Sequence, residues 1–301
     1  MRLAVFDRPG EGPFRIGVVE AGPDVELVRD ITAVLPAVFD SWPEQRMNWL
    51  IRNWAELASR LPAAAGDQLP VASVVLRAAN PAPPQLFAIP ANFRAHLGEI
   101  GDRSVTTGGR TAREAGFFLK AAGSVSGAGQ PVALPAGSTR RFDHECELGV
   151  VIGRGGRNIP RERAFEHVFG YSCLIDMTMR IERGSFEEDR SLRKSFRGFT
   201  PLGPYLVTAD EIPDVTALHS RLLVNGVQRQ SAEMKDMIVP IDEAIELISS
   251  VVDLRPGDVI ASGTPGGVDR VTPGDEVTIA VDGVGEMTLS VVEAEPAPRP
   301  F

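Results

Sequence analysis

Two glutamates separated by a single residue are the first candidates for chemistry in this sequence. Glu145 and Glu147 lie in the segment His144–Gly153, whose β-branched run predicts a buried strand. Side chains alternate between the faces of a strand, so both carboxylates should extend from one face. Neighbouring carboxylates repel each other unless a proton or a cation lies between them, and a divalent ion with oxygen ligands meets that need. An edge strand with two solvated glutamates fits the same spacing, so both interpretations stay open.

A third acid and a basic cluster follow along the chain. Asp176 is a lone carboxylate among apolar neighbours, and such an aspartate is seldom buried without a partner. Its partner is either a metal ion or Arg180, and the residues alone favour neither. The segment Arg190–Pro204, which contains Lys194, is basic within an acidic protein. It suits an anionic substrate, although a solvated basic loop is equally consistent with it.

The composition excludes several classes of protein. Of the 301 residues, 43% are apolar and 24% are charged, which is typical of a packed globular chain rather than a disordered one. The formal net charge of −9 disfavours general binding to nucleic acid or to an anionic membrane surface. The sequence contains no apolar run of membrane-spanning length and no signal-peptide pattern, so we expect a cytoplasmic protein. Motifs of phosphate-binding loops, dinucleotide folds, zinc proteases and serine hydrolases are absent.

The elements that must position the candidate residues are mostly strands. The 30 glycines and 24 prolines predict many turns between short strands. We expect an α+β, β-rich fold with a small N-terminal α+β domain over residues 1–78 and a larger domain over residues 79–301. The boundary precedes a stiff, proline-rich connector at residues 80–84.

Helix and strand patterns can be assigned along both parts of the chain. Apolar residues at spacings of three and four predict a helix over residues 43–61, and we also expect helical segments over residues 93–100, 161–169 and 241–250. The polar segment 101–116 has no clear period and is expected to form a loop of functional length. Strands are predicted over residues 3–6, 14–20, 86–89, 117–120, 142–152, 205–207, 221–224, 259–261, 277–281 and 287–292.

Five segments of the chain resemble motifs of the fumarylacetoacetate hydrolase family. They are residues 92–99, 144–153, 169–180, 194–204 and 257–268, and each motif is weak alone but the set spans roughly 200 residues. The resemblance implies a mixed β-roll catalytic domain, usually homodimeric. It also implies a bound Mg²⁺ or Mn²⁺, with Ca²⁺ possible, and activity on small anionic 2-oxo acids such as acylpyruvates and related diketones.

The resemblance assigns roles to individual residues. The metal ligands of the family fall on Glu145, Glu147 and Asp176, and the substrate-facing lysine falls on Lys194. A catalytic His–Glu dyad falls on His96 and Glu99, beside a loop that would act as a lid. Residues three apart on a helix share a face, so Glu99 would orient His96, which would activate water.

Substrate contacts follow from the same resemblance, with one departure. Thr264 would hold the substrate carboxylate together with nearby backbone N–H groups such as that of Gly263. Arg180 is expected to brace Asp176 more than to touch the substrate. The family's asparagine before the third ligand is Ile175 here, so a polar contact is lost or is supplied by Arg183.

The expected activity is metal-dependent hydrolysis of a C–C bond in an acylpyruvate-like 2-oxo acid. An enolate forms when that bond breaks, and a divalent ion stabilises it. Decarboxylation or keto–enol isomerisation of a 2-oxo or hydroxydienoic diacid needs the same enolate and is the alternative. A non-catalytic ligand-binding protein is the less favoured third hypothesis, because Lys194 and all three acidic ligands are present.

Overall fold

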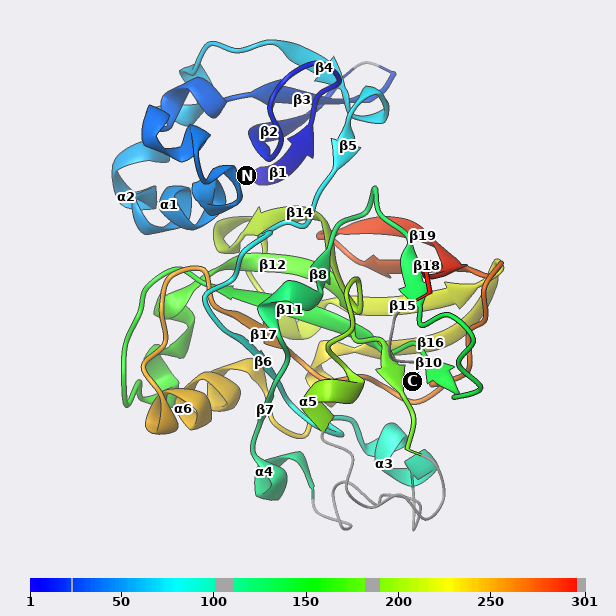
Figure 1. Cartoon of the computed structure of the whole chain (residues 1–301). Helices are drawn as coiled ribbons and strands as arrows, with labels where there is room; N and C mark the ends of the chain where they lie inside the picture. Colours follow the sequence, from blue (N-terminus) through cyan, green and yellow to red (C-terminus); the bar gives the residue numbers. More distant parts are fainter. Residues whose placement is uncertain (23, 101–110, 182–189, 297–301) are drawn as a thin grey trace.

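A computed structural model describes residues 1–22, 24–100, 111–181 and 190–296, without the side chains of Leu97, Glu99 and Ile100. The chain begins with paired strands and a short helical segment that lies beside them (Figure 1). Figure 1 shows these strands at one end of the molecule, with the helices beside them. Their bounds are β1 (Arg2–Asp7), β2 (Arg15–Ala21), β3 (Glu26–Asp30), β4 (Gln68–Pro70), β5 (Val75–Leu76), α1 (Arg46–Arg52) and α2 (Trp54–Leu57).

A twelve-stranded mixed sheet runs from this end into the centre of the protein. Its order is β4-β3-β2-β1-β14-β12-β11-β17-β6-β7, and β5 and β8 pair with β1 and β14. Its other strands are β6 (Leu86–Ala88), β7 (Phe118–Leu119), β8 (Val125–Ser126), β11 (Cys146–Ile152), β12 (Val168–Ile175), β14 (Thr200–Thr208) and β17 (Val259–Ala261). The longest of these, β11, β12 and β14, are buried almost throughout, as continuous apolar runs predict.

Two smaller sheets complete the β structure. A five-stranded sheet has the order β16-β15-β18-β19-β9, and β10 forms a two-stranded sheet with β13. The first contains β9 (Val132–Leu134), β15 (His219–Val224), β16 (Val227–Glu233), β18 (Glu276–Val281) and β19 (Gly285–Glu293). The second contains β10 (Phe142–Asp143) and β13 (Thr178–Met179). The predicted α+β, β-rich class is confirmed.

The remaining α-helices lie away from the N-terminal strands β1–β4 (Figure 1). Helix α6 (Ile241–Val251) buries Ile241, Ala244, Ile245 and Ile248 along one face, which is the amphipathic pattern that the sequence predicts. Helices α3 (Arg94–Ile100), α4 (Ala112–Ala115) and α5 (Arg190–Arg193) gather at the end of the molecule opposite β1–β4 (Figure 1). Within the described part of the chain, no helix has both the length and the hydropathy needed to cross a membrane.

Two predicted helices are wrong in extent. The segment 43–61 breaks at Asn53, whose backbone leaves helical dihedrals and whose side-chain amide donates to the carbonyl of Trp49 at 2.8 Å. The segment 161–169 is a 3₁₀ helix only over Arg161–His167, and strand β12 begins at the next residue. That strand pairs with β11 on one side and β14 on the other, and this long-range pairing outweighs local helical preference.

Two apolar clusters lie on opposite faces of the central sheet. On β11, Cys146, Leu148, Val150 and Ile152 belong to one cluster, and Val151 belongs to the other. This alternation matches the apolar face predicted for the strand. The domain boundary near residue 78 stays a prediction, and the sheet is continuous across it because Arg2 on β1 pairs with Val207 on β14.

Candidate metal centre

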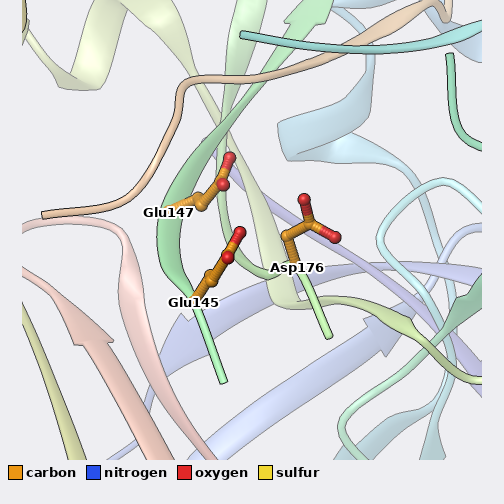
Figure 2. A group of neighbouring side chains, drawn as sticks. All are labelled: Glu145, Glu147 and Asp176. Atoms are coloured by element: carbon orange, nitrogen blue, oxygen red, sulfur yellow. The ribbon is translucent and has the colours of Figure 1, made fainter. Parts of the chain in front are cut away.

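Three carboxylates meet where β11 begins and β12 ends. The two strands are antiparallel with Cys146 opposite Ile175, so Glu145 before β11 and Asp176 after β12 are neighbours. One ligand oxygen from each of Glu145, Glu147 and Asp176 lies within 4.8 Å of the others. Figure 2 shows the side chains of Glu145 and Glu147 extending in the same direction, with Asp176 beside them. The predicted convergence of these three acids is therefore confirmed.

The triad is deeply buried. Glu145, Glu147 and Asp176 expose 5%, 2% and 1% of their surface. Strand β11 lies between β12 and β17, so it is not an edge strand. The alternative of two solvated glutamates on a sheet edge is excluded. Carboxylates removed from water in this way need compensating charge or protons.

Lys194 supplies part of that charge. Its Nζ donates to Oε2 of Glu145 and to Oδ2 of Asp176, both at 2.7 Å, and to the hydroxyl of Thr178 at 2.7 Å. The alternative of a solvated basic loop is wrong for this residue, because Lys194 is only 6% exposed. A cation thus bridges two members of the triad.

Lys120 is a second buried cation, and sequence reasoning missed it. Its Nζ donates to Oδ1 of Asp176 and, at 3.0 Å, to the carbonyl of Phe199. Burial lowers the pKa of Lys120, although the Asp176 carboxylate opposes that shift. The available signal was a lysine that ends the apolar segment Phe117–Leu119, since a lysine in such a position needs a buried partner.

Arg180 has different partners from those predicted. Instead of bracing Asp176, its Nε donates to Oδ2 of Asp143 at 2.6 Å and its Nη2 donates to Oε1 of Glu145 at 2.8 Å. Residue 180 follows the short strand β13, which pairs with β10 and so faces Asp143 rather than residue 176. Arg180 therefore supports the triad through Glu145.

Glu147 has no cationic partner among the described residues. Its Oε2 accepts only the backbone N–H of Gly263, at 2.8 Å. Burial, with the nearby charges of Asp176 and Glu145, raises its pKa well above the ordinary value. Burial alone would also raise the pKa of Glu145, but Lys194 and Arg180 hold it below its usual range. Glu147 is therefore the member of the triad whose ionised form the described cations compensate least.

The donor set fits a hard divalent ion. Three carboxylates supply oxygen ligands, and ions such as Mg²⁺ and Mn²⁺ prefer oxygen. The charge left on Glu147 is one that a proton or a cation must neutralise. The geometry and the charge of the site are thus both compatible with a bound divalent ion.

The other predicted site residues lie at varied positions. His96 on α3 is 5% exposed, and it is one of the groups that favour the ionised form of Glu145 and so lower its pKa. Thr264 and Gly263 follow β17 and adjoin the triad through the Gly263–Glu147 hydrogen bond. The predicted contact of the Gly263 N–H with a substrate carboxylate is wrong, because Glu147 accepts that N–H. The side chain of Glu99, all of Arg183 and residues 101–110 of the predicted loop 101–116 lie outside the described residues. The described end of that predicted loop contains the short helix α4 instead.

The fold and the site together define a class of β-rich proteins with a buried carboxylate triad. A family model described as fumarylacetoacetate (FAA) hydrolase C-terminal matches residues 85–292. A maleylpyruvate hydrolase from Aquipseudomonas alcaligenes is 39% identical over 284 residues, which cover 92% of this chain and 96% of that protein. The chain belongs to the fumarylacetoacetate hydrolase family, as its motifs predicted, and the predicted mixed β-roll class is confirmed.

Solved structures extend the comparison. Maleylpyruvate hydrolase from Sphingobium sp. SYK-6 is 38% identical, with a TM-score of 0.81 over 98% of this chain and 100% of that one. The same protein has been solved in complex with manganese(II) and pyruvate. A 2-hydroxyhepta-2,4-diene-1,7-dioate isomerase from Mycobacterium marinum is 26% identical, with a TM-score of 0.74 over 98% of this chain and 99% of that one.

Proposed function

We propose that this protein is a metal-dependent hydrolase that cleaves a C–C bond in an acylpyruvate-like 2-oxo acid. The observation that carries the proposal is the buried triad of Glu145, Glu147 and Asp176. The similar Sphingobium protein, whose complex contains manganese(II) and pyruvate, supports the same ion class and the same product class. Maleylpyruvate, named in both hydrolase relatives, is the first substrate to test.

The triad would hold Mg²⁺ or Mn²⁺. When bound, such an ion supplies Lewis-acid stabilisation of negative charge on the oxygens of a 2-oxo acid. The protein's own contribution is to fix the ligand geometry, because Lys194 and Lys120 anchor Asp176 while Lys194 and Arg180 anchor Glu145. Ligands held in place by such contacts lose little freedom when they bind.

His96 is assigned the role of general base, with Glu99 as the residue that orients it. The imidazole would take a proton from water as the water oxygen attacks the acyl carbonyl. The C–C bond then breaks, and its electron pair remains on the carbon of the departing 2-oxo acid, which takes up a proton to become pyruvate. The positive charge of Lys194 would stabilise the oxygen on which negative charge develops, and the Thr264 hydroxyl would hold the substrate carboxylate.

Isomerisation or decarboxylation is the second candidate. The similar Mycobacterium marinum structure is of an isomerase acting on a hydroxydienoic diacid, and such a reaction needs the enolate without an attacking water. Arg180 and Arg183 are retained as proposed contacts to a second carboxylate of such a substrate. The cytoplasmic location and the homodimer stay predictions.

One experiment separates these reactions. Purified protein is incubated with a panel of acylpyruvates, including maleylpyruvate, and with hydroxydienoic diacids, in Mg²⁺, in Mn²⁺ or in EDTA. The products are identified by mass. Hydrolysis adds the mass of water across two fragments, decarboxylation loses CO₂, and isomerisation leaves the mass unchanged. The proposal expects cation-dependent release of pyruvate from an acylpyruvate, and equal turnover in EDTA would reject it.

A further inference from the structure

Gln230 is buried beside the proposed substrate site, although neighbouring residues of its strand face solvent. In β16, Val227, Gln228 and Arg229 are exposed, while Gln230 is 1% exposed. The register explains this difference, because Leu222 pairs with Gln230 but Leu223 pairs with Gln228. An extra residue, Arg229, is therefore inserted opposite this step. Such a bulge redirects the following side chain, here toward the interior.

All four hydrogen-bonding positions of the Gln230 amide are used. Oε1 accepts from the backbone N–H of Cys146 at 2.9 Å and lies 3.0 Å from Nδ1 of His144. Nε2 donates to the hydroxyl oxygen of Thr264 at 2.8 Å and to the carbonyl of Pro265 at 2.9 Å. A side-chain amide has two acceptor and two donor positions, so none remains.

These partners fix which end of the amide faces which neighbour. The N–H of Cys146 can only donate and the carbonyl of Pro265 can only accept, so the oxygen and the nitrogen of Gln230 cannot exchange places. It follows that the Thr264 hydroxyl oxygen must accept from Gln230. It also follows that Nδ1 of His144 carries a proton.

The orientation of Thr264 follows in turn. The hydroxyl oxygen of Thr264 accepts from Gln230, so the hydroxyl proton remains available to a different acceptor. Among the described residues, no acceptor for this proton is found. Thr264 comes directly after Gly263, whose N–H donates to Glu147 of the triad. The segment that carries Gly263 and Thr264 packs closely against the bulge at Arg229. A Cβ on Gly267 would lie only 2.0 Å from the carbonyl oxygen of Arg229, so there is no room for a side chain between the two backbones.

We propose that Gln230 is a positioning residue that keeps the hydroxyl of Thr264 as a hydrogen-bond donor toward the carboxylate of the bound 2-oxo acid. This inference rests on the proposed function, because it needs a carboxylate at Thr264. Gln230 does not touch the substrate in this account. It acts through Thr264, and its Oε1 contacts attach the same amide to the segment that carries Glu145.

The test is a double-mutant cycle between Gln230 and Thr264. Gln230→Glu keeps the shape but removes both donors, and its carboxylate would draw the Thr264 proton away from the substrate. Thr264→Val removes the hydroxyl. Each change should raise KM for the acylpyruvate and the Kd of pyruvate with Mn²⁺ about tenfold, with kcat within about threefold, because a contact to the non-reacting carboxylate is made equally in ground and transition states.

The combined variant gives the decisive result. If Gln230 acts through Thr264, the double variant is no weaker than Thr264→Val alone. Gln228→Glu makes the same chemical change at an exposed position of the same strand, and it should leave KM and Kd unchanged. Circular dichroism identifies folded variants, and Gln230→Met, which removes the donors without burying a charge, replaces Gln230→Glu if the latter does not fold.

The outcomes separate this inference from the proposed function. Fully additive effects of the two changes, or a wild-type KM in a folded Gln230 variant, would reject the role of Gln230 while the hydrolase stands. If the wild-type protein with Mn²⁺ neither binds pyruvate nor releases it from any acylpyruvate, the proposed function and this role are rejected together.

Discussion

The backbone N–H of Asp176 donates to the carbonyl of Glu145 at 2.9 Å. This single bond joins the end of β12 to the segment that leads into β11, so two carboxylates 31 positions apart in sequence emerge side by side. The site is therefore built by sheet register rather than by a local motif. Residues that fix this register, and residues that neutralise the charge of the carboxylates, should therefore affect activity and stability as much as the ligands do.

The assignment of His96 as the water-activating base predicts a selective loss of hydrolysis. His96→Ala should lower kcat for acylpyruvate hydrolysis about 10²- to 10⁴-fold, which is the usual contribution of general-base catalysis. Tautomerisation of a simple 2-oxo acid needs no attacking water and should be largely retained. Both reactions are measured on one preparation with Mn²⁺, and an equal loss of both would contradict a dedicated role in water activation.

The buried pair of Lys120 and Asp176 predicts a stability change that depends on the metal. Lys120→Met leaves the Asp176 carboxylate with one cation fewer, and breaking a buried pair costs about 3–5 kcal/mol of unfolding free energy. Saturating Mn²⁺ should reduce this cost, because an ion would then compensate Asp176. Urea unfolding with and without Mn²⁺ measures both values.

The matched control for Lys120 is Lys235→Met. Lys235 is exposed and pairs with Glu233 at the surface, so its loss should leave the unfolding free energy almost unchanged. A Lys120→Met variant as stable as this control would show that the buried pair contributes nothing.

Asp258 predicts how stability changes with pH, independently of the metal site. Its Oδ2 accepts from the N–H of Arg255 and from Gln85, but its buried Oδ1 has no partner in the described part of the chain. Burial raises its pKa to about 6. The Asp258 carboxyl therefore keeps its proton in the folded state at pH values where the unfolded chain has already released it. Because the unfolded state then binds fewer protons, the contribution of Asp258 to the free energy of unfolding falls as pH rises from about 4 to 7.

Asp258→Asn removes that dependence. Between about pH 4 and pH 7, the unfolding free energy of the variant should rise by about 1–3 kcal/mol relative to that of wild type. Asp282→Asn changes an exposed carboxylate and serves as the matched control. Denaturant unfolding at several pH values provides the measurement, and a difference between Asp258→Asn and wild type that is constant with pH would contradict the account.

The raised pKa of Glu147 predicts that protons compete with the metal. Burial, Asp176 and Glu145 favour the protonated form, so an ion that binds Glu147 must displace a proton. Mn²⁺ affinity should therefore fall as pH is lowered, by up to about tenfold per unit where one proton is released. Calorimetry in buffers of different ionisation enthalpy counts that proton, and a pH-independent Kd would argue against Glu147 as a ligand.

Sequence reasoning predicted the residues whose chemistry is unusual for their surroundings. Glu145, Glu147 and Asp176 are acids in apolar strands, and alternation along a strand was enough to place the first two on one face. Family motifs then linked Asp176 to them, and β11–β12 pairing confirmed that link. His96 and Thr264 were located by motif alone, and their roles stay proposals.

Sequence reasoning failed where a contact depends on long-range register. Lys120 meets Asp176 across 56 positions, and nothing local to either residue identifies the partner. Gln230 is buried only because a bulge at Arg229 reverses the side-chain alternation, so a regular strand pattern would place Gln228 and Gln230 on the same face. Arg180 was paired with the wrong acid because the β10–β13 ladder, which turns it toward Asp143, has only two residues per strand.

Titration of metal-free protein with Mn²⁺ by calorimetry tests the central claim most directly. Wild type should bind one ion, and Glu147→Gln, which keeps the shape of the side chain but removes the charge, should weaken binding at least about 100-fold and abolish acylpyruvate cleavage. Glu166→Gln, at an exposed glutamate paired with Arg163, should bind like wild type. Unchanged Mn²⁺ affinity in folded Glu147→Gln would contradict the account.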